Sequence, residues 1–253
     1  MAVGAVLVGA GAGTRLGAQV PKALVRLGDR ALVAHAVARL AATGVVGEIV
    51  VTAPAGFGEQ VRAAARSALA GVASVVEDAG SSAAVELTLH VIEGDYPSRQ
   101  ASVAAGLDRL STPDSGVVLV HDAARPLTPP ATMRRLVEAI RAGHDAVVPV
   151  LPLADTIRMI DPEDPTRAQG VVDRRHLRAV QTPQAFRAQV LRQAHAENAD
   201  RGQQESAAAT DDAVLIEEMS VPVHLLDGDR SAMKITDRHD LAAAETLLAE
   251  GHL

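Results

Sequence analysis

The chain of 253 residues contains no cysteine and no tryptophan, and its aromatic side chains are limited to one tyrosine and two phenylalanines. The absence of cysteine excludes disulfide scaffolds, thiol nucleophiles and cysteine-ligated zinc or iron–sulfur sites. The shortage of aromatic rings argues against proteins that hold single-stranded nucleic acid by stacking its bases. Because 48% of the residues are nevertheless hydrophobic, the core must be built from Ala, Val, Leu and Ile. This composition favours tightly packed helices against a valine-rich sheet.

Basic side chains and long apolar runs are also scarce. The 24 Lys and Arg residues are outnumbered by 31 Asp and Glu residues, which leaves a net charge of −7. Because proteins that bind a nucleic-acid backbone usually present a basic face, we expect no nucleic-acid partner. No run reaches the roughly 18 apolar residues of a membrane helix, and the first residues lack the positive segment of an export signal. We therefore expect a soluble, cytoplasmic protein with no membrane partner.

Short Val/Ile-rich runs alternate with amphipathic stretches rich in Ala, Leu and Arg, which is typical of a wound α/β sheet. Strands are predicted at residues 3–9, 48–52, 73–77, 90–93, 117–120, 146–150 and 221–226. Helices are predicted at residues 31–43, 60–69, 98–110, 130–142, 187–198, 211–219 and 239–249. Continuous apolar runs such as VVLV at 117–120 suit strands covered on both faces. The pattern predicts an α/β fold with helices on both faces of the sheet.

Two stretches interrupt this alternation. Residues 80–85 (GSSAAV) are small and polar, which predicts a surface loop within a longer insertion. Residues 152–176 contain two short β-like runs, 156–160 and 170–172, around a Pro/Asp turn, which predicts a β-hairpin arm projecting from the main sheet. Because strands this short are not stable alone, we expect the arm to pack against a second subunit.

The strongest chemical signal is the run GAGAGTRLGAQVPKAL at residues 9–24, directly after the first predicted strand. Glycines alternate with alanines from Gly9 to Gly13, which permits positive φ angles and exposes backbone N–H groups. Successive N–H groups in such a loop form a concavity for phosphate oxygens. Arg15 and Lys22 add two cations beside that concavity. The loop therefore predicts a polyphosphate site.

Two other phosphate-binding patterns fit this loop less well. The Walker A spacing requires Ser or Thr after its lysine, and no Lys-Ser or Lys-Thr follows a loop glycine here. The dinucleotide-binding pattern G-x-G-x-x-G lacks its third glycine, because Thr14 stands there, and it leaves Arg15 and Lys22 unexplained. The remaining alternative is a glycine-rich turn with two solvated basic residues, which the offsets of the Arg and the Pro-Lys pair disfavour.

The sequence resembles known nucleotidyltransferases at several motifs. A run G-x-G-[ST]-R-[LM] followed by P-K after an N-terminal strand is similar to the sugar-nucleotide pyrophosphorylase and cytidylyltransferase superfamily, in which this loop wraps a nucleotide triphosphate. Four further segments follow in order: HDAARP at 121–126, VQTPQ at 180–184, TDD at 210–212, and KIT at 234–236 with Asp240-Leu241 after it. Together they resemble the 2-C-methyl-D-erythritol 4-phosphate cytidylyltransferase family, from the first strand to the last helix. The SAMKIT and PLTPP runs look similar to its actinobacterial branch.

The resemblance implies a fold, a reaction and a set of site residues. The fold is a single Rossmann-like nucleotidyltransferase domain of residues 1–253, with a mostly parallel mixed sheet and residues 152–176 as a β-arm for homodimerisation. The reaction is transfer of a cytidylyl group from CTP to 2-C-methyl-D-erythritol 4-phosphate, in non-mevalonate isoprenoid biosynthesis, with Mg²⁺ as cofactor. The implied catalytic residues are Arg15, Lys22 and Lys234. The implied nucleotide contacts are Ala10, Gly11, Ala12, Gly13, Thr14, Gly94, Ser102, Asp122 and Ala123, and the implied acceptor contacts are Arg125, Thr156, Arg174 and Thr210.

The HDAARP run also has a physical interpretation. Asp122 follows a predicted buried strand, at the edge where open α/β sheets bind ligands. A lone carboxylate beside a triphosphate suits Mg²⁺, which commonly takes one or two carboxylates plus phosphate oxygens. The alternatives are a helix cap or turn for Asp122 and a structural salt bridge for Arg125. We expect His121 to be structural, because an acceptor phosphate is already an anion near pH 7 and needs no general base.

The other implied contacts also have alternative, structural roles. Ser102, in the R-Q-x-S-V run at 99–103, fits an ordinary helix residue as well as a cytosine contact. The preceding loop at 94–98 (GDYPS) departs from the family's usual paired glycines. Thr210 fits a helix N-cap as well as an acceptor contact. Lys234 fits a snorkelled surface lysine as well as a phosphate contact, and Ala232 replaces the family's usual asparagine.

The arm residues depend most on the resemblance, which implies that Thr156 and Arg174 reach into the partner subunit's site. Taken alone, Arg174 is a solvated loop charge. The shortage of aromatic residues predicts that backbone and small side chains, and not a stacked ring, hold the cytosine.

Three other functions compete with this one. A cytidylyltransferase acting on ribitol 5-phosphate or a related polyol phosphate would share the motifs and differ around the arm. A nucleotidyltransferase using UTP, GTP or dTTP with a sugar phosphate is disfavoured by the R-Q-x-S-V and HDAARP runs. A non-catalytic nucleotide-binding module is disfavoured because Arg15, Lys22, Asp122 and Lys234 are retained together.

Overall fold

The computed structural model describes residues 1–11, 13, 16–17, 20–70 and 87–251. Within these ranges the main sheet has eight strands. They are β1 (Val3–Val8), β4 (Glu48–Pro54), β5 (Thr88–Gly94), β6 (Val117–Asp122), β7 (Ala146–Pro152), β10 (Arg178–Val180), β11 (Gln184–Arg187) and β12 (Val223–Asp227). β10 and β11 run antiparallel to their neighbours, and the others share one direction. The predicted mostly parallel, mixed sheet is confirmed.

Helices cover both faces of this sheet, and every predicted helix is present. The described α-helices are α1 (Leu32–Ala41), α2 (Gly58–Ala70), α4 (Arg99–Arg109), α5 (Pro130–Arg141), α6 (Ala188–Glu197), α7 (Ala199–Gly202), α8 (Asp212–Glu218) and α9 (Arg238–Ala249). Short 3₁₀ helices are η2 (Lys22–Leu24), η4 (Arg174–His176) and η5 (Arg230–Ala232). None of the helices in the described ranges combines the length and the apolar character that a bilayer crossing requires.

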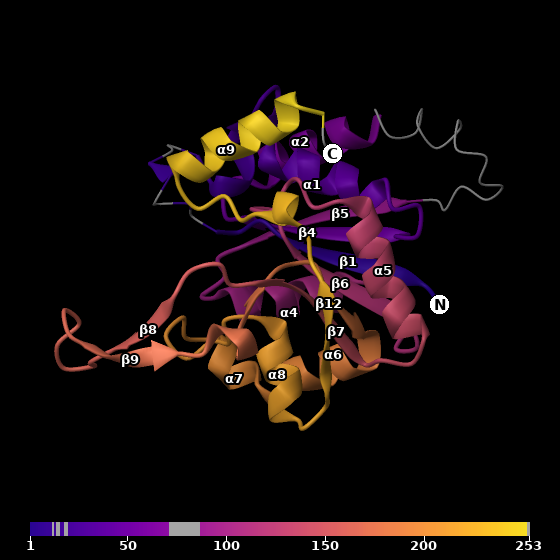
Figure 1. The fold of residues 1–253 in the computed structure, drawn as a ribbon. Helices are drawn as coiled ribbons and strands as arrows, with labels where there is room; N and C mark the ends of the chain where they lie inside the picture. The colour runs from indigo at the N-terminus through magenta and orange to yellow at the C-terminus, as the bar shows by residue number, and fades with distance from the viewer. Residues whose placement is uncertain (12, 14–15, 18–19, 71–86, 252–253) are drawn as a thin grey trace.

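Alternate residues of β6 contribute to two separate halves of the core. Leu119 belongs to a cluster with α1, α2 and α5, whereas Val118 and Val120 belong to a cluster with α4, α6 and α8. Figure 1 shows α1 and α2 above the sheet and α4, α6 and α8 below it. Because both faces of β6 are buried, its sequence has no polar alternation, and this explains the continuous VVLV run.

The strand β11 lies in the centre of the sheet, between β6 and β7, where the sequence predicted no strand. It has only four residues, and its first residue is Gln184, a polar side chain that is completely buried. Neither its length nor its pattern distinguishes it from a loop. β10 and β12 lie on opposite edges of β7, because Val150 pairs with both Val180 and Asp227.

All the other predicted strands that fall within the described residues are present. The predicted strand at 73–77 and the predicted loop at 80–85 lie outside the described residues. Two small antiparallel pairs stand apart from the main sheet, β2 (Arg26–Leu27) with β3 (Arg30–Ala31), and β8 (Ile157–Ile160) with β9 (Ala168–Val172). The second pair is the predicted hairpin, which projects from the body of the molecule (Figure 1).

Side-chain caps fix the start of three helices that reach the candidate site. Ser98 caps α4, Asp211 caps α8 and Asp237 caps α9, each by accepting hydrogen bonds from backbone N–H groups of the first turn. Such caps satisfy donors that the helix itself leaves unpaired. The caps therefore place Arg99 and Asp212 in the first turns of α4 and α8.

Candidate active site

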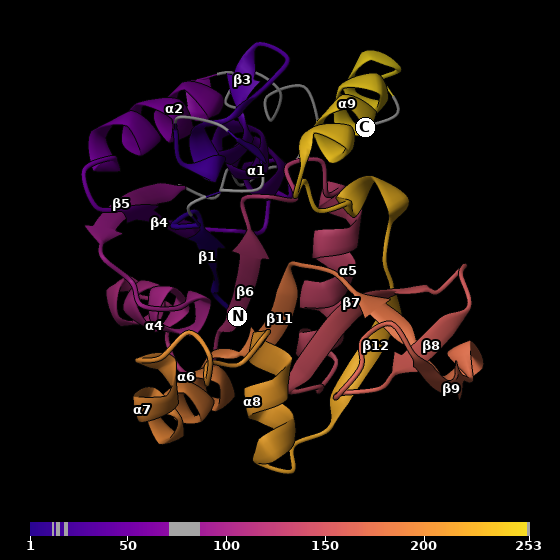
Figure 2. The ribbon, with the colours of Figure 1, turned by 90° about the vertical axis from the view of Figure 1, so that its left-hand side faces the viewer.

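The candidate site forms at the carboxyl ends of β1 and β6, which are neighbouring strands (Figure 2). Val8, the last residue of β1, pairs with Asp122, the last residue of β6. The Ala123 N–H then donates to the Val8 carbonyl at 3.0 Å, so this N–H is used by the fold. The glycine-rich loop and the HDAARP run therefore leave the sheet side by side. This is the edge at which open α/β sheets bind ligands.

The described part of the glycine-rich loop folds back onto Lys22. The Lys22 N–H donates to the Gly11 carbonyl at 3.3 Å, and Gly13 has a positive φ of 67°. A Cβ at Gly13 would lie 2.8 Å from the Cβ of Lys22, so this close approach requires glycine. Ala10 and Gly13 are partly exposed and Gly11 is exposed, which leaves this backbone accessible to a ligand.

The Lys22 side chain lies at the start of η2, close to the first turn of α9. Hydrogen bonds from Thr236 lower the pKa of the Asp240 carboxyl, and the nearby charge of Lys22 lowers it further. Lys22 and the KIT segment are therefore neighbours. The other loop residues implied in phosphate binding, Ala12, Thr14 and Arg15, lie outside the described residues, and their roles stay predictions.

Asp122 is the electrostatic centre of the site. Its Oδ1 accepts a hydrogen bond from Arg99 Nε at 3.1 Å, and its Oδ2 accepts one from Lys234 Nζ at 2.7 Å. Burial alone would raise the pKa of Asp122, but the charges of Arg99 and Lys234 hold that pKa well below its ordinary range. The carboxylate is therefore ionised throughout the neutral pH range.

A divalent cation is compatible with this carboxylate. The two oxygens of Asp122 offer about four acceptor positions, and the bonds to Arg99 and Lys234 use one on each oxygen. Mg²⁺ commonly binds one or two carboxylates and takes phosphate and water oxygens as its other ligands. No cluster of three or more His, Asp or Glu side chains suited to a metal ion occurs in the described ranges. Asp122 therefore fits as a ligand of a cation whose other ligands are phosphate and water oxygens.

Backbone contacts on both sides of Lys234 tie its segment to the HDAARP run. The Ile235 N–H donates to the Ala124 carbonyl at 2.8 Å, and Arg125 Nη1 donates to the Ala232 carbonyl at 2.7 Å. Ala232 has a buried side chain, and its carbonyl takes part in this link. The side chain of Lys234 is 41% exposed, so it is not fully sequestered.

The guanidinium of Arg125 donates hydrogen bonds to backbone carbonyls of two other segments. Besides Ala232, it binds the Val180 carbonyl, which accepts from Nη2 at 3.1 Å, and burial lowers its pKa. Its described partners are carbonyls, so the salt bridge considered as its alternative role is not formed. Its predicted contact with the acceptor phosphate stays a prediction.

His121 is completely buried. Its Nδ1 lies 3.0 Å from the Thr182 hydroxyl oxygen, and that oxygen also accepts the Asp122 N–H at 3.0 Å. Nε2 is buried without a partner. Burial lowers the pKa of His121 to about 4, so the ring is neutral at neutral pH. These contacts agree with the structural role expected for this residue.

The burial of His121 predicts a pH-dependent stability. Its pKa is about 6.5 in the unfolded chain and about 4 in the folded chain, so below pH 6.5 the unfolded chain binds the proton more readily. The stabilising effect of the neutral ring is complete above pH 6.5 and is lost as the pH falls toward 4. We expect the free energy of unfolding to fall by about 2 kcal/mol between pH 7.5 and pH 5 from this group.

Urea unfolding at the two pH values measures this loss. His121→Asn keeps a polar atom near Thr182 and removes the titration, so this variant should lose about 2 kcal/mol less than the wild type over the same pH interval. Equal losses in the two proteins would show that His121 does not titrate as its burial predicts.

The VQTPQ run connects two loops to the sheet. Gln181 Nε2 donates to the Asp229 carbonyl at 2.8 Å, and the Asp229 N–H donates back to Gln181 Oε1 at 3.0 Å. Gln184 Nε2 donates to Asp211 Oδ2 at 2.9 Å. The two glutamines therefore hold the segment before Lys234 and the start of α8.

Of the two implied cytosine contacts discussed above, Ser102 is buried and Gly94 is partly exposed. Ser102 is 1% exposed, and its hydroxyl lies 2.7 Å from the hydroxyl of Thr52. The ring of Tyr96 lies against Gly94, since a Cβ at Gly94 would be 2.8 Å from Tyr96 Cζ. An aromatic ring therefore lies beside one of the implied cytosine contacts. The base contacts of Gly94 and Ser102 stay predictions.

Thr210 is exposed directly before α8. The cap of α8 is Asp211, whose Oδ1 accepts the Val214 N–H at 3.1 Å, so the alternative role of Thr210 as N-cap is wrong. The structure thus leaves the Thr210 hydroxyl on the surface of the segment that Gln184 holds. Its acceptor contact stays a prediction.

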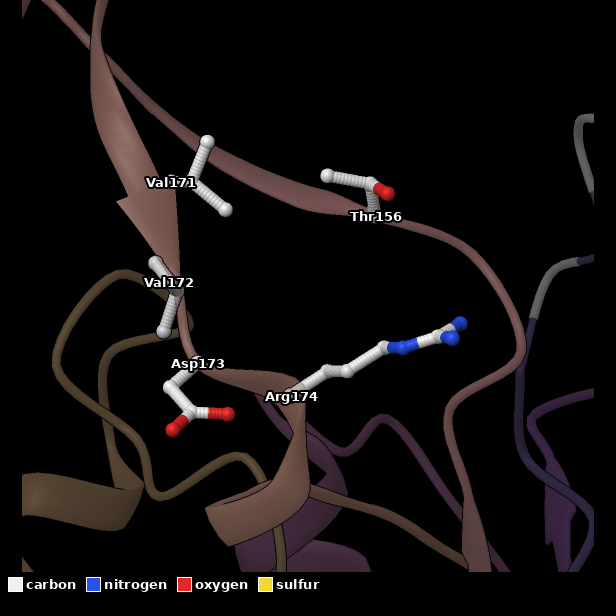
Figure 3. A pocket seen from close by; sticks show the side chains of 5 residues that line it. All are labelled: Thr156, Val171, Val172, Asp173 and Arg174. Atoms are coloured by element: carbon white, nitrogen blue, oxygen red, sulfur yellow. The ribbon is translucent and has the colours of Figure 1, made fainter.

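In the arm, Thr156 and Arg174 lie on facing segments and line a hollow of about 320 Å³ (Figure 3). The neighbouring Arg175 pairs with Asp173 at 2.7 Å, whereas the Arg174 side chain has no hydrogen bond or ion pair within the described residues. The lining of this hollow comes from the arm alone. The structure therefore brings Thr156 and Arg174 together but does not join them to Asp122 or Lys234 of the same chain.

Sequence reasoning gave no role to Arg99 and Asp212. Arg99 Nη1 donates to Asp212 Oδ2 at 2.7 Å, and both side chains are connected to Asp122. The available signal was their presence in the R-Q-x-S-V and TDD runs. This signal was insufficient because Arg99 and Asp212 are 113 positions apart in the sequence.

Comparison with known proteins bears on the whole chain. The sequence model of 2-C-methyl-D-erythritol 4-phosphate cytidylyltransferase matches residues 3–250. A protein of that name from Nocardia farcinica is 44% identical over 248 residues, covering 96% of this chain and 93% of the relative. A second relative of that name, from Saccharopolyspora erythraea, is 43% identical over 251 residues. The match covers 98% of this chain and 100% of the relative. Both relatives are actinobacterial, which agrees with the SAMKIT and PLTPP runs.

A solved structure supports the same comparison. The crystal structure of 2-C-methyl-D-erythritol 4-phosphate cytidylyltransferase from Thermus thermophilus is 34% identical in sequence and superimposes with a TM-score of 0.70. The match covers 98% of this chain and 100% of that chain. The similarity therefore extends over the sheet, both helical layers and the arm.

Proposed function

Because the chain belongs to the 2-C-methyl-D-erythritol 4-phosphate cytidylyltransferase family, we propose that it transfers the cytidylyl group of CTP to 2-C-methyl-D-erythritol 4-phosphate. The products are 4-diphosphocytidyl-2-C-methyl-D-erythritol and pyrophosphate, and the reaction belongs to non-mevalonate isoprenoid biosynthesis. We also propose that residues 1–253 form one nucleotidyltransferase domain. We also propose that the reaction takes place in the cytoplasm.

One structural observation carries this proposal. The pairing of Val8 with Asp122 sets the glycine-rich loop beside the HDAARP run, and Lys234 Nζ binds Asp122 at 2.7 Å. Exposed backbone and the Lys234 ammonium group thus lie at one edge of the sheet beside an ionised carboxylate, and Lys22 lies near Asp240, which binds Thr236 of the same segment. Such an arrangement suits a triphosphate with a divalent cation.

In the proposed reaction an oxygen of the acceptor phosphate attacks the α-phosphorus of CTP. A new phosphorus–oxygen bond forms, the bond from the α-phosphorus to the bridging oxygen breaks, and pyrophosphate leaves on the opposite side with that electron pair. No proton has to be removed, because the attacking oxygen is already anionic. The main obstacle is repulsion between the two anions. Positioning and positive charge therefore supply most of the rate acceleration.

The cationic side chains have distinct tasks. Lys22 and Arg15 stabilise the charge that develops on the departing pyrophosphate. Lys234 binds the α-phosphate and the acceptor phosphate, and its compact ammonium group has three donors with which to do so. Asp122 would hold Mg²⁺, which when bound neutralises phosphate charge. Thr210 and, from the partner subunit, Thr156 and Arg174 bind the acceptor phosphate.

We propose that the arm, residues 152–176, forms a homodimer. Three of its apolar side chains are largely exposed: Met159 at 52%, Ile160 at 58% and Val171 at 59%. Exposed apolar clusters commonly mark interaction surfaces. Arg174 is without a described partner, as expected for a residue whose ligand lies in another subunit.

A heterodimer of two inactive subunits tests this arrangement. One subunit carries Lys22→Ala and the other carries Arg174→Ala, and the heterodimer is purified through two different tags. If Arg174 serves the partner's site, one site is assembled from wild-type residues, and we expect about half of the wild-type activity per dimer.

If Arg174 serves its own subunit, every site in that heterodimer carries one substitution. Its activity would then not exceed the mean of the two parent homodimers, which would contradict the exchange of arms. Heterodimers that carry both substitutions in one subunit provide the matched control, since the proposal then predicts that both sites are defective.

The proposed activity itself is tested by pyrophosphate release. We expect release to require CTP, Mg²⁺ and methylerythritol phosphate together, with UTP, GTP or dTTP giving little turnover. CTP binding without pyrophosphate release under all of these conditions would instead indicate a non-catalytic nucleotide-binding module.

A further inference from the structure

A line of charged side chains extends from the proposed site into the space between α4, α6 and α8. Asp122 binds Lys234 on one side and Arg99 on the other. Arg99 Nη1 donates to Asp212 Oδ2 at 2.7 Å, and Asp212 Oδ1 lies 2.9 Å from His195 Nε2. The proposed function uses Asp122 and Lys234, and it leaves Arg99, Asp212 and His195 without a role.

Asp212 is too deeply placed to touch a substrate. It is 1% exposed, and each of its oxygens already has a partner, Arg99 or His195. A buried carboxylate is expensive to keep unless it is paired and hydrogen-bonded. Any effect of Asp212 on the reaction must therefore pass through its partners.

Arg99 divides its guanidinium between two carboxylates. Nε binds Asp122 and Nη1 binds Asp212, while Nη2 is buried without a partner. Arginine often binds one carboxylate through two parallel donors. Here Arg99 gives Asp122 a single hydrogen bond, and the Oδ2 of Asp122 is bound by Lys234.

We propose that Asp212 and Arg99 are positioning residues that keep the Asp122 carboxylate available to Lys234 and to the divalent cation. Asp212 holds one end of the guanidinium. Without that charge, Arg99 turns its Nε and Nη2 donors onto Asp122 together and occupies both of its oxygens. This inference rests on the proposed function, because it takes Asp122 as the residue that holds the metal.

The variant Asp212→Asn tests this role with little change in shape. The measured quantity is the gain in CTP affinity on adding Mg²⁺, obtained by calorimetry as the ratio of the dissociation constants without and with the metal. Residues that orient a metal ligand typically contribute 10- to 100-fold to metal affinity. We expect the gain to be at least roughly tenfold smaller in Asp212→Asn than in the wild type.

Two further variants make the result specific. Asp145→Asn is the matched control, because Asp145 also forms an ion pair with an arginine, here with Nε of Arg187 at 2.7 Å, and it has no described contact with Asp122. Its Mg²⁺-dependent gain should equal that of the wild type. Arg99→Lys keeps the charge but replaces the planar fork by a point charge, so it should also reduce the gain.

The outcomes separate this inference from the proposed function. The inference would be overturned if Asp212→Asn and Arg99→Lys both showed the same Mg²⁺-dependent gain in CTP affinity as the wild type. If the melting temperature of these variants fell while that gain stayed unchanged, the role of the two residues would be purely structural, and the inference would also fail. The variant Asp122→Asn tests the underlying site. If Asp122→Asn also keeps the full gain, the placement of the metal at Asp122 fails, and the inference fails with it.

Discussion

Replacing Lys22 by alanine is expected to lower kcat by roughly 10²–10³-fold, the loss typical of a donor that stabilises transition-state charge. The Lys22 N–H bond to Gly11 and the close approach of Gly13 involve only backbone and Cβ atoms, which alanine retains. The variant should therefore fold normally. Its defect should be in turnover more than in CTP affinity, because the charge of the leaving group grows as the bond breaks.

Steady-state kinetics with a melting curve measures both parts of this expectation. Lys22→Arg is the matched control, since it keeps the charge and changes its geometry, and it should retain more activity than Lys22→Ala. Arg15→Ala should be affected to a similar degree. Near-wild-type kcat in a folded Lys22→Ala protein would remove the glycine-rich loop from the mechanism.

Replacing Lys234 by alanine is expected to lower kcat by a similar factor, roughly 10²–10³-fold. The position of Lys234 in the structure supports this expectation. Lys234 Nζ binds Asp122 at 2.7 Å and its side chain is 41% exposed, so this compact cation is able to contact phosphate from where it stands. Asp122 keeps its bond to Arg99 in the variant, so the fold should persist.

The low lysine content of the chain allows a second, independent test of Lys234. Lys22 and Lys234 are the only two lysines of the chain, and all other Lys/Arg positions are arginines. An amine-directed reagent such as pyridoxal phosphate therefore reports on these two side chains and on the N-terminus. We expect CTP with Mg²⁺ to slow the modification of both lysines. Unchanged modification of Lys234 and wild-type turnover of Lys234→Ala would both contradict its role.

The parts of the fold that follow a local pattern were predictable. Strands β1, β4 and β6 each contain a continuous apolar stretch because both of their faces are buried, and the helices show amphipathic stretches with clear ends. β11 was not predictable, because four residues beginning with the buried Gln184 carry no period. Its place is set by the strands on either side of it.

The site was predictable to the extent that its residues lie in contiguous motifs. HDAARP and KIT named Asp122 and Lys234, but their contact joins residues 112 positions apart, and no local pattern records it. Arg125 shows the opposite problem. Its motif implied a phosphate contact, whereas the structure shows its guanidinium donating to the carbonyls of Val180 and Ala232.

The net charge of −7 disfavours the binding of anionic substrates, so the site needs a local excess of positive charge. The structure shows how part of this is done, since Asp122 is flanked by Arg99 and Lys234, and Lys22 lies near Asp240. An acidic protein binds two phosphate anions only where its cations are concentrated in this way.

The most direct test of the proposed function compares acceptors with CTP and Mg²⁺ as the common reagents. We predict turnover of 2-C-methyl-D-erythritol 4-phosphate with one pyrophosphate released per cytidyl diphosphate product, and a kcat/KM for ribitol 5-phosphate lower by roughly 10²-fold or more. Turnover of ribitol 5-phosphate alone would contradict the proposed acceptor while leaving the cytidylyl-transfer chemistry in place.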